Sequence, residues 1–264
     1  MPKLLVDGSP EGRIPADDPG LLLGMTVFDT LRTYGRVPFR LDAHVRRLGA
    51  SAAIMGIPMP PPAQVRAELL DALEPDAWLR YTLTAGGHRV LQVHPVDPAR
   101  IARPIAVDWL VWPEGVGPPG PVKHGNRAWW IRAAQQAGVD EVLLVRPNGE
   151  LCEASLSNVI AVVDGALVTP PTDGRCLEGV TRGAMLDAAA RAGLPLREGV
   201  VRRDDPIEEL YVCSTLKELA PIGRIGGAPG PGAGPLGRAL HQAFRALVAE
   251  ACGEDPGGPL VGDR

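Results

Sequence analysis

The first 112 residues show two hydrophobic periods, and each period predicts a different kind of element. Apolar residues recur at helical spacing in DAHVRRLGASAAIMG, which predicts a helix with Asp42 as its N-cap and an end near Gly56. A second, shorter helix is expected in AQVRAELLDAL. Strand-forming residues flank a turn at 34–36 in TVFDTLRTYGRVPFRL, which predicts a hairpin, and further strands are expected in AWLRYTLTAGG, RVLQVHPV and IAVDWLVW. These elements predict a compact α+β unit that ends near Trp112.

A proline- and glycine-rich stretch, PEGVGPPGP, follows this unit. Proline disfavours helix at the preceding residue and glycine loosens the backbone, so residues 113–121 are predicted to be a linker between domains 1–112 and 122–264. Helices are expected in NRAWWIRAAQQAG, GVTRGAMLDAAARAG and LGRALHQAFRALVAEACG. Turn signals at 148–149 and 164–165 join strands in DEVLLV, ELCEASLSNVIAVV and ALVTPP, and more strands are expected in ELYVCST and ELAPIGRI. The second domain is therefore predicted to contain antiparallel sheet.

Composition and charge restrict the classes of function. The chain of 264 residues is 45% hydrophobic and 22% charged with a net charge of -4, so it lacks the basic excess that nucleic acid binding requires. We find no signal peptide and no apolar run of the roughly 18 residues that a membrane span needs, which predicts a cytoplasmic protein without a membrane partner. The four cysteines are widely spaced, which favours buried thiols and predicts no metal site.

Lysine is rare in this chain, which has only Lys3, Lys123 and Lys217. Arginine stays charged and suits anions, whereas lysine can lose its proton and become a nucleophile. Lys3 lies close to the start of the sequence and Lys217 stands beside Glu218, whereas Lys123 stands where the second domain is predicted to begin. Lys123 is therefore the candidate for a reactive amine.

Six short motifs follow one another between about Asp18 and Ile222: FDTLRTYG, HVRRL, the lysine of KHGN, CEASLSN, GVTR and STLKELAPI. In these motifs the chain resembles the class IV aminotransferases. These fold type IV pyridoxal phosphate enzymes include branched-chain and D-amino-acid aminotransferases, (R)-selective amine transaminases and aminodeoxychorismate lyase. The resemblance implies a two-domain α+β fold with a small N-terminal α/β domain and a larger C-terminal domain containing an antiparallel pseudo-barrel sheet. It also implies a homodimer.

The resemblance further implies the cofactor pyridoxal 5'-phosphate, which needs an amine, an acid partner for its pyridine nitrogen and a cradle for its phosphate. Lys123 resembles the family's Schiff-base lysine, which also acts as general base and acid. Glu153 resembles the carboxylate that pairs with the pyridine nitrogen and favours its protonated form. Ser157 and Asn158 belong to the same cofactor-binding motif.

The cofactor's phosphate needs hydrogen-bond donors and positive charge. Val180 and Thr181 open the helix predicted in GVTRGAMLDAAARAG, and the unpaired amides of a helix N-terminus suit an anion. Ser214 and Thr215 follow a predicted strand and offer hydroxyl and amide donors. Arg47 matches the family's His-x-x-Arg-Leu pattern, so the resemblance assigns it a charge-assisted contact with the phosphate.

Substrate contacts are expected on two of the predicted strands. The strand period of two places alternate residues of TVFDTLR on one face, and the resemblance assigns that face to the substrate pocket. Ala85 stands where D-amino-acid aminotransferases carry the first arginine of a carboxylate trap, which predicts that this trap is absent. The histidine His88 and its neighbour Arg89 are the candidate substitutes. That histidine is equally compatible with an ordinary loop position. The predicted substrate-binding residues are Phe28, Thr30, Arg32, Arg80 and His88.

Three functions agree with these motifs. The first is an aminotransferase that moves an amino group from an amino acid or a primary amine to a 2-oxo acid. Thr30 also favours a second function, because lyases of this fold often carry threonine there: an aminodeoxychorismate lyase that releases pyruvate and 4-aminobenzoate. The third is a non-enzymatic small-molecule binding protein that retains the fold and would be colourless.

Overall fold

The computed structural model describes residues 2–112, 122–174, 176–253 and 255–263, so the predicted linker 113–121 lies outside the described residues. Its contacts divide the chain into two compact units. Among the described residues, the first unit contains 2–96, 122–126 and 251–253, and the second contains the others. The segment around Lys123 therefore belongs to the first unit, although it follows the predicted linker.

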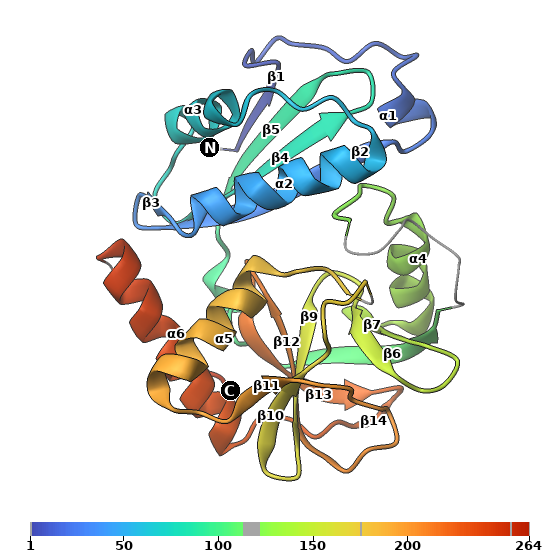
Figure 1. Cartoon of the computed structure of the whole chain (residues 1–264), viewed down its shortest axis with the longest axis vertical. Coiled ribbons are helices and arrows are strands. Elements are labelled where there is room, and N and C mark those ends of the chain that lie inside the picture. Colours follow the sequence, from blue (N-terminus) through green and yellow to red (C-terminus); the bar gives the residue numbers. More distant parts are fainter. Residues whose placement is uncertain (1, 113–121, 175, 254, 264) are drawn as a thin grey trace. The chain divides into compact units, whose positions relative to one another are not determined.

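The first unit is built on a five-stranded antiparallel sheet in the order β1-β5-β4-β2-β3 (Figure 1). Three helices accompany it, and α2 packs on β2 and on α3. The strands are β1 (Lys3–Val6), β2 (Thr26–Tyr34), β3 (Val37–Pro38), β4 (Ala77–Thr84) and β5 (Arg89–Pro95). The helices are α1 (Pro19–Leu22), α2 (Leu41–Met55) and α3 (Pro62–Asp71).

Alternate residues of the central strands form the core of the first unit. Val27 and Leu31 on β2, and Leu79 and Leu83 on β4, are buried in one apolar cluster with Val45 and other residues of α2 and α3. Because strand side chains alternate, the residues between them lie on the other face of the sheet. That other face carries Phe28, Thr30, Arg32 and Arg80, which the sequence predicts to contact the substrate.

The second unit contains a curled nine-stranded sheet in the order β11-β10-β9-β12-β13-β6-β7-β8, with β14 paired to β13 (Figure 1). Buried side chains such as Val107, Leu143, Val159, Val212 and Ile222 form its core. The strands are β6 (Ile105–Val111), β7 (Glu141–Val145), β8 (Leu151–Ala154), β9 (Asn158–Val163), β10 (Ala166–Thr169), β11 (Leu196–Glu198), β12 (Ile207–Ser214), β13 (Glu218–Ile225) and β14 (Ala228–Pro229).

Helices pack against this sheet by apolar faces and by a capping carboxylate. Trp130 of α4 packs against Val142 and Leu144 of β7. The Glu209 carboxylate of β12 accepts hydrogen bonds from the first amides of α6, at 3.2 Å from Leu236 N and 2.8 Å from Gly237 N, which satisfies the donors of that helix end. The helical segments are η1 (Pro98–Arg100), α4 (Ala128–Ala137), α5 (Val180–Ala192) and α6 (Pro235–Cys252).

The structure confirms the predicted α+β fold and the turns that local sequence specifies. Asp164 and Gly165 both have positive φ, 50° and 69°, as the two-residue turn between antiparallel strands β9 and β10 requires. Gly56 ends α2 in the left-handed conformation, as expected. The predicted N-cap is wrong, because Arg40 occupies that position and Asp42 lies inside the first turn of α2, where it pairs with Arg66.

One strand joins a different sheet from the one that its position in the sequence suggests. The strand β6 pairs in parallel with β13 and β7 of the second unit, so the two units divide after Val96 and not near Trp112. A parallel strand next to β6 also means that the second sheet is mixed and not wholly antiparallel. Non-local pairing of this kind leaves no signal in the hydrophobic period of the strand itself.

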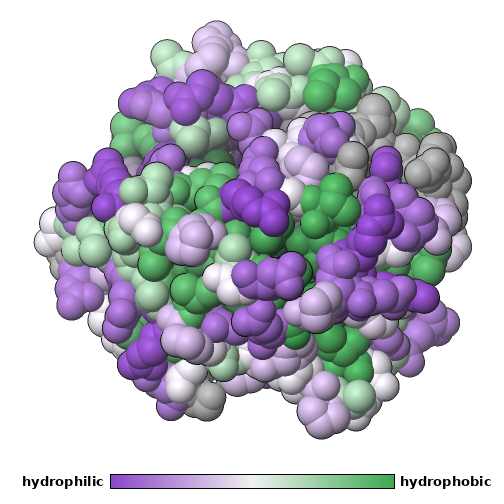
Figure 2. Space-filling view, turned by 60° about the horizontal axis from the view of Figure 1, so that its bottom comes forward, coloured by the Kyte–Doolittle hydropathy of each residue, from purple (hydrophilic) through white to green (hydrophobic). Residues whose placement is uncertain are grey.

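No helix of the described residues is long and apolar enough to cross a membrane. Over the face drawn in Figure 2, hydrophobic residues lie in several separate places between hydrophilic ones. Among the described residues, the large apolar side chains with the highest exposed fractions are Trp129, Leu21, Leu22 and Leu23.

Candidate functional site

Lys123 is held against the beginning of β2 by its own backbone and by the residues that follow it. Its carbonyl accepts a hydrogen bond from Phe28 N at 2.9 Å, and its amide donates to Ser51 Oγ of α2 at 3.1 Å. His124 forms a bridge with Val27, and Gly125 N donates to Thr26 O at 2.9 Å. The Lys123 ammonium nitrogen lies 5.1 Å from the centroid of the Phe28 ring. The lysine is therefore fixed at both of its backbone groups, with its amine on the sheet face that carries Phe28.

The other two lysines bind carboxylates. Lys3 pairs with Glu74 at the edge of the first sheet. Lys217 donates to Glu141 Oε1 at 2.6 Å, and Glu141 is fully buried. Both of these side chains are thus engaged in ion pairs.

Arg47, predicted to bind phosphate, forms a bidentate ion pair with Asp29 of β2. Its Nε and Nη2 donate to the two carboxylate oxygens of Asp29, each at 2.8 Å. His44, one turn earlier on α2, contacts Asp29 Oδ1 through Nδ1 at 2.7 Å. The Arg47 side chain is only 11% exposed. The carboxylate thus fixes both the rotamer and the direction of this guanidinium group.

Burial and charge act in opposite directions on this cluster. Burial alone would raise the pKa of Asp29, but the charges of Arg47 and His44 and their hydrogen bonds hold it well below its usual range. Burial lowers the pKa of His44, and the positive charges of Arg47 and Lys123 act in the same direction, against the attraction of Asp29. Asp29 is therefore an anion in the folded protein.

The residues of β2 and β4 that are predicted to contact the substrate share one face of the first sheet. In the antiparallel register Phe28 lies opposite Thr82, Thr30 opposite Arg80, and Arg32 opposite Trp78, so all of these lie on one face. The Arg80 guanidinium carbon is 3.7 Å from the centroid of the Phe28 ring, and Arg32 lies 4.1 Å above the ring of Tyr34. Phe28, Arg80 and Lys123 therefore share one small region of this face.

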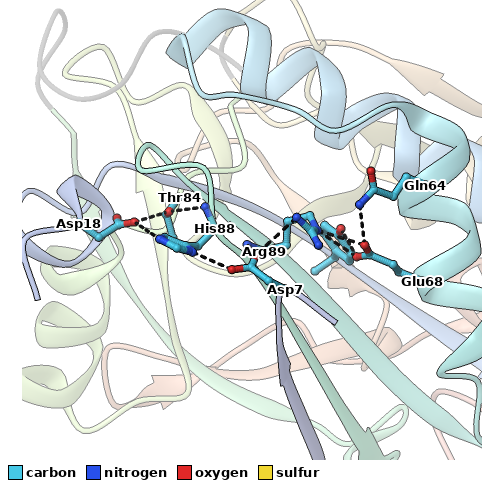
Figure 3. Close-up of polar contacts among 8 residues, drawn as sticks. Asp7, Asp18, Gln64, Glu68, Thr84, His88 and Arg89 are labelled. Atoms are coloured by element: carbon cyan, nitrogen blue, oxygen red, sulfur yellow. Dashed lines mark hydrogen bonds and ion pairs between the residues drawn. The ribbon is translucent and has the colours of Figure 1, made fainter. Parts of the chain in front are cut away.

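His88, by contrast, lies between two carboxylates (Figure 3). Its Nδ1 is 2.7 Å from Asp7 Oδ2, and its Nε2 is 4.0 Å from Asp18 Oδ2. Thr84 Oγ1 donates to the same Asp18 oxygen at 2.7 Å and also accepts from His88 N at 3.1 Å. Two neighbouring anions disfavour the approach of a substrate carboxylate, and this arrangement instead ties the β4–β5 turn to the first twenty residues.

A test of the Lys123 segment is the substitution Gly125→Ala. A Cβ at this position would overlap Thr26 Oγ1, so we expect a loss of about 1–3 kcal/mol in the free energy of unfolding and a lower kcat. Both effects should shrink in the Thr26→Ala background, because the colliding hydroxyl is then gone. Gly49→Ala on α2 is the matched control, since its new methyl group would meet only the flexible Met59 side chain. Chemical denaturation and steady-state rates give both quantities, and equal losses in the two backgrounds would contradict the steric explanation.

In the second unit, Glu153 and Asn158 converge on the segment before α5. Leu177 N donates to Glu153 Oε2 at 3.1 Å, and Asn158 Nδ2 donates to Leu177 O at 2.8 Å. A Cβ at Gly179 would overlap Asn158 Oδ1, so only glycine allows the backbone to pass this close to β9. The structure thus brings together Glu153 and Asn158, both predicted from the sequence, at the entrance to α5.

The first turn of α5 offers backbone donors. Gly179 is its N-cap residue and provides no side-chain cap, and the first helical residues are Val180 and Thr181. The helix is anchored farther along by Arg182, which donates to Thr169 Oγ1 at 3.1 Å and Pro170 O at 2.9 Å. An uncapped N-terminus held rigidly in this way suits an anion such as a phosphate group.

Ser214 is the last residue of β12, where it pairs with Glu218 of β13, and Thr215 follows it in the turn between the two strands. This turn ends at Glu218, which has a positive φ of 54° and is buried. His241 Nε2 and Arg245 Nε hold the Glu218 carboxylate at 2.8 and 3.0 Å, and this over-determined anchor offsets the strain of a left-handed non-glycine residue. The turn that presents Ser214 and Thr215 is therefore fixed from the α6 side.

Ser157, predicted to bind the cofactor, contacts a buried carboxylate. Its hydroxyl donates to Glu141 Oε1 at 2.7 Å, and Leu156 N donates to Glu141 Oε2 at 2.8 Å. Glu141 therefore holds the β8–β9 turn and Lys217 together. The side chain of Ser157 supports this turn in the structure, next to Asn158.

Two residues of these clusters were missed by the sequence reasoning. Asp29 alternates with Val27 and Leu31, so a carboxylate on the apolar face of a strand was a visible signal that a buried cation must lie nearby. Glu141 left no such signal, because it opens a strand with an uninterrupted apolar run. Its partner lysine is distant in the sequence.

A comparison with known protein families finds one that matches most of this chain. The family model described as amino-transferase class IV matches residues 26–225 of this chain. The chain is 27% identical over 277 residues to a D-alanine aminotransferase of Listeria monocytogenes, with 92% of this chain and 94% of that protein covered.

Solved structures share the fold. The branched-chain aminotransferase of Thermoproteus uzoniensis, solved with norvaline, matches with a TM-score of 0.82 at 23% identity and covers 96% of this chain and 95% of its own. A hypothetical aminotransferase of Mycobacterium tuberculosis in a PLP-bound form matches with a TM-score of 0.79 at 20% identity, covering 95% of this chain and 99% of its own. The arrangement of helices and strands is therefore that of fold type IV aminotransferases.

Proposed function

Because the chain belongs to the class IV aminotransferase family and is thus a transaminase, we propose that it moves an amino group from an amino acid or a primary amine to a 2-oxo acid, with pyridoxal 5'-phosphate bound through Lys123. The position of the Lys123 amine supports this proposal most directly. It lies 5.1 Å from the centroid of the Phe28 ring, on the face of β2 and β4 that the family resemblance assigns to the substrate.

The donor groups of the chain fit this cofactor. Its chemistry, when bound, is to withdraw electrons from substrate Cα so that the α-proton becomes acidic. The Glu153 carboxylate would hold a proton on the pyridine nitrogen. The backbone amides of Val180 and Thr181, with the hydroxyls of Ser214 and Thr215, would bind the phosphate.

Arg47 would add positive charge to the phosphate contacts. Its Nε and Nη2 atoms donate to the Asp29 carboxylate, and this ion pair fixes the orientation of the guanidinium group. A cation that is already oriented loses little side-chain entropy when an anion binds. Asn158 acts indirectly, because it holds the Leu177 segment that leads into α5.

Lys123 has two tasks in this proposal. Its neutral amine is the nucleophile that holds the cofactor covalently, and its Nζ then takes the proton from substrate Cα and returns one later in the reaction. The fixed backbone of residues 123–125 keeps this amine in one place during both steps. Phe28 and Thr30 would line the substrate pocket beside it.

A lyase is the second candidate, because Thr30 lies on the substrate face, opposite Arg80. An aminodeoxychorismate lyase would release pyruvate and 4-aminobenzoate from aminodeoxychorismate. We also propose that the protein is a homodimer, as the family resemblance implies, and light scattering of the purified protein measures its mass directly.

The test begins with the purified protein and added pyridoxal phosphate. We expect a yellow protein whose colour is bleached by borohydride reduction, which should leave the cofactor covalently attached to a peptide containing Lys123. A panel of L- and D-amino acids and (R)-amines, each with a 2-oxo acid, should then identify at least one donor. Release of pyruvate from aminodeoxychorismate without amino transfer would favour the lyase. A colourless protein with no fixed lysine would contradict both proposals and favour a binding protein.

A further inference from the structure

The segment that follows α6, residues 255–263, returns to the middle of that helix. Its Val261 is completely buried, and the Val261 amide donates to His241 Nδ1 at 3.0 Å. Two carbonyl oxygens of the same segment accept hydrogen bonds from Arg245 Nη1 and Nη2, at 2.8 and 2.9 Å. This segment, which we call the returning segment, is therefore held to α6 by one buried side chain and three backbone groups.

The same two helix residues hold the Glu218 carboxylate at the start of β13. His241 Nε2 lies 2.8 Å and Arg245 Nε lies 3.0 Å from Glu218 Oε2. Each of the two side chains thus binds Glu218 with one nitrogen and the returning segment with its other ring or guanidinium nitrogens. The side chains of His241 and Glu218 are 0% and 1% exposed, so water has little access to this contact. The segment is connected to Glu218 by two bridges.

The bond from the returning segment also determines the tautomer of His241. A neutral imidazole has one donor and one acceptor nitrogen. Because the Val261 N–H is a donor, Nδ1 must accept, and we assign the ring proton to Nε2, which donates it to the Glu218 carboxylate. The other tautomer would turn a nitrogen lone pair toward that carboxylate. Loss of the Val261 amide therefore removes the group that selects the binding tautomer.

Glu218 needs this anchor because its backbone is strained. Its φ of 54° is one that residues other than glycine keep only where the surrounding structure enforces it. In the pairing of β12 with β13, Glu218 lies opposite Ser214, and Thr215 follows Ser214 in the turn. These two residues are the ones that the proposed function assigns to the cofactor's phosphate. A relaxed backbone at Glu218 would shift the turn and the donors that it carries.

We propose that the returning segment positions the phosphate-binding turn through His241, Arg245 and Glu218, so that the affinity for the cofactor's phosphate depends on residues 255–263. This inference rests on the proposed function and adds positioning residues to the same site. A turn that is already held in its binding conformation loses less conformational freedom when an anion binds. His241 and Arg245 act only through Glu218, and the phosphate is bound by the turn.

The experiment compares pyridoxal phosphate with pyridoxal, which keeps the aldehyde and the pyridine ring but lacks the phosphate. Each is titrated into the cofactor-free protein, and the quenching of tryptophan fluorescence gives its dissociation constant. In a chain truncated after residue 253, the dissociation constant of pyridoxal phosphate should rise by at least about tenfold, the equivalent of one hydrogen bond to a charged group. The dissociation constant of pyridoxal should change by less than about threefold.

Truncation also removes the buried Val261 side chain, so a point variant that retains the segment completes the test. His241→Gln keeps a donor for Glu218 but leaves the Val261 amide without its acceptor, and it should raise the dissociation constant of pyridoxal phosphate by about three- to tenfold. In the truncated chain the same substitution should add less than about twofold, because its partner is already gone. Asp263→Asn is the matched control, since it removes only the exposed ion pair with Arg238 and should change neither constant.

The outcomes separate this inference from the proposed function. Circular dichroism of each cofactor-free variant identifies a loss of fold, and if the truncated chain is unfolded, the result for His241→Gln decides. Equal weakening of both ligands in that variant, or no change in either, would overturn the inference while the unmodified protein still binds pyridoxal phosphate. If the unmodified protein binds neither ligand, the proposed function fails and the inference fails with it.

Discussion

Replacing Lys123 with arginine should abolish amino transfer, the yellow absorbance and the covalent label that borohydride reduction leaves on the lysine. Arginine keeps the positive charge over Phe28 but cannot act as a nucleophile or give up its proton at neutral pH. A positioned general acid or base alone contributes about 10²–10⁴ in rate, so kcat should fall by at least about 10³-fold when the nucleophile is lost as well. Steady-state rates with the best donor and the spectrum of the purified variant measure the two effects.

The other two lysines provide matched controls for this substitution. Lys3→Arg and Lys217→Arg keep the ion pairs with Glu74 and Glu141, so both variants should retain the absorbance and most of the rate. Partial recovery of the Lys123→Ala variant by added methylamine would show that an amine is what the site lacks. Activity in Lys123→Arg, or a borohydride-fixed label on another lysine, would overturn the assignment.

Replacing Asp29 with asparagine should lower the free energy of unfolding by about 3 kcal/mol or more. Asp29 is 4% exposed and serves two partners, so its neutralisation leaves the largely buried Arg47 without a counter-charge and weakens the hydrogen bond with His44. Removing one member of a buried ion pair typically costs about 3–5 kcal/mol for this reason. Denaturant unfolding monitored by tryptophan fluorescence gives the difference.

Asp42→Asn is the control for Asp29→Asn. Asp42 lies on the same α2 helix segment as His44, but its ion pair with Arg66 is exposed, and exposed pairs contribute about 0–1 kcal/mol. Similar losses of unfolding free energy in the two variants would show that burial does not increase the contribution of the Asp29 ion pair to stability.

Acid titration provides a second test of Asp29. The folded-state pKa of this carboxyl lies below its value of about 3.9 in unfolded chains, so the stability it contributes is present above about pH 4 and is lost as the pH falls further. The Asp29→Asn variant should therefore show a shallower loss of stability below pH 4 than the unmodified protein. Parallel curves would mean that folding does not lower the pKa of Asp29.

Local sequence patterns predicted most individual elements because their causes are local. The turn at Asp164 and Gly165 needs two residues with positive φ, and these residue types adopt that conformation most readily. Glycines 138 and 193 end helices in the left-handed conformation for the same reason. Strand alternation likewise separated the core face of β2 from the face with Phe28, Thr30 and Arg32.

Pairings between distant segments could not be predicted in this way. The strand β6 joined the second sheet because β7 and β13 lie on its two sides, and neither partner is encoded in its own hydrophobic period. His88 looked like a substitute substrate ligand from its place after β4, yet Asp7 and Asp18 approach it from a segment about 70 to 80 residues earlier. Its neighbours, and not its position in the sequence, decide what it can bind.

The sequence by itself determined the family, the α+β class and the candidate amine, because motif spacing, residue period and the rarity of lysine are properties of the chain alone. Only the tertiary structure decided which charged groups are already matched. Asp29 forms an ion pair with Arg47, Glu141 forms one with Lys217, and two carboxylates flank His88. Arg80, in contrast, forms no ion pair with a carboxylate of the described residues. Charge pairing depends on distance and burial, and folding sets both by bringing remote residues together.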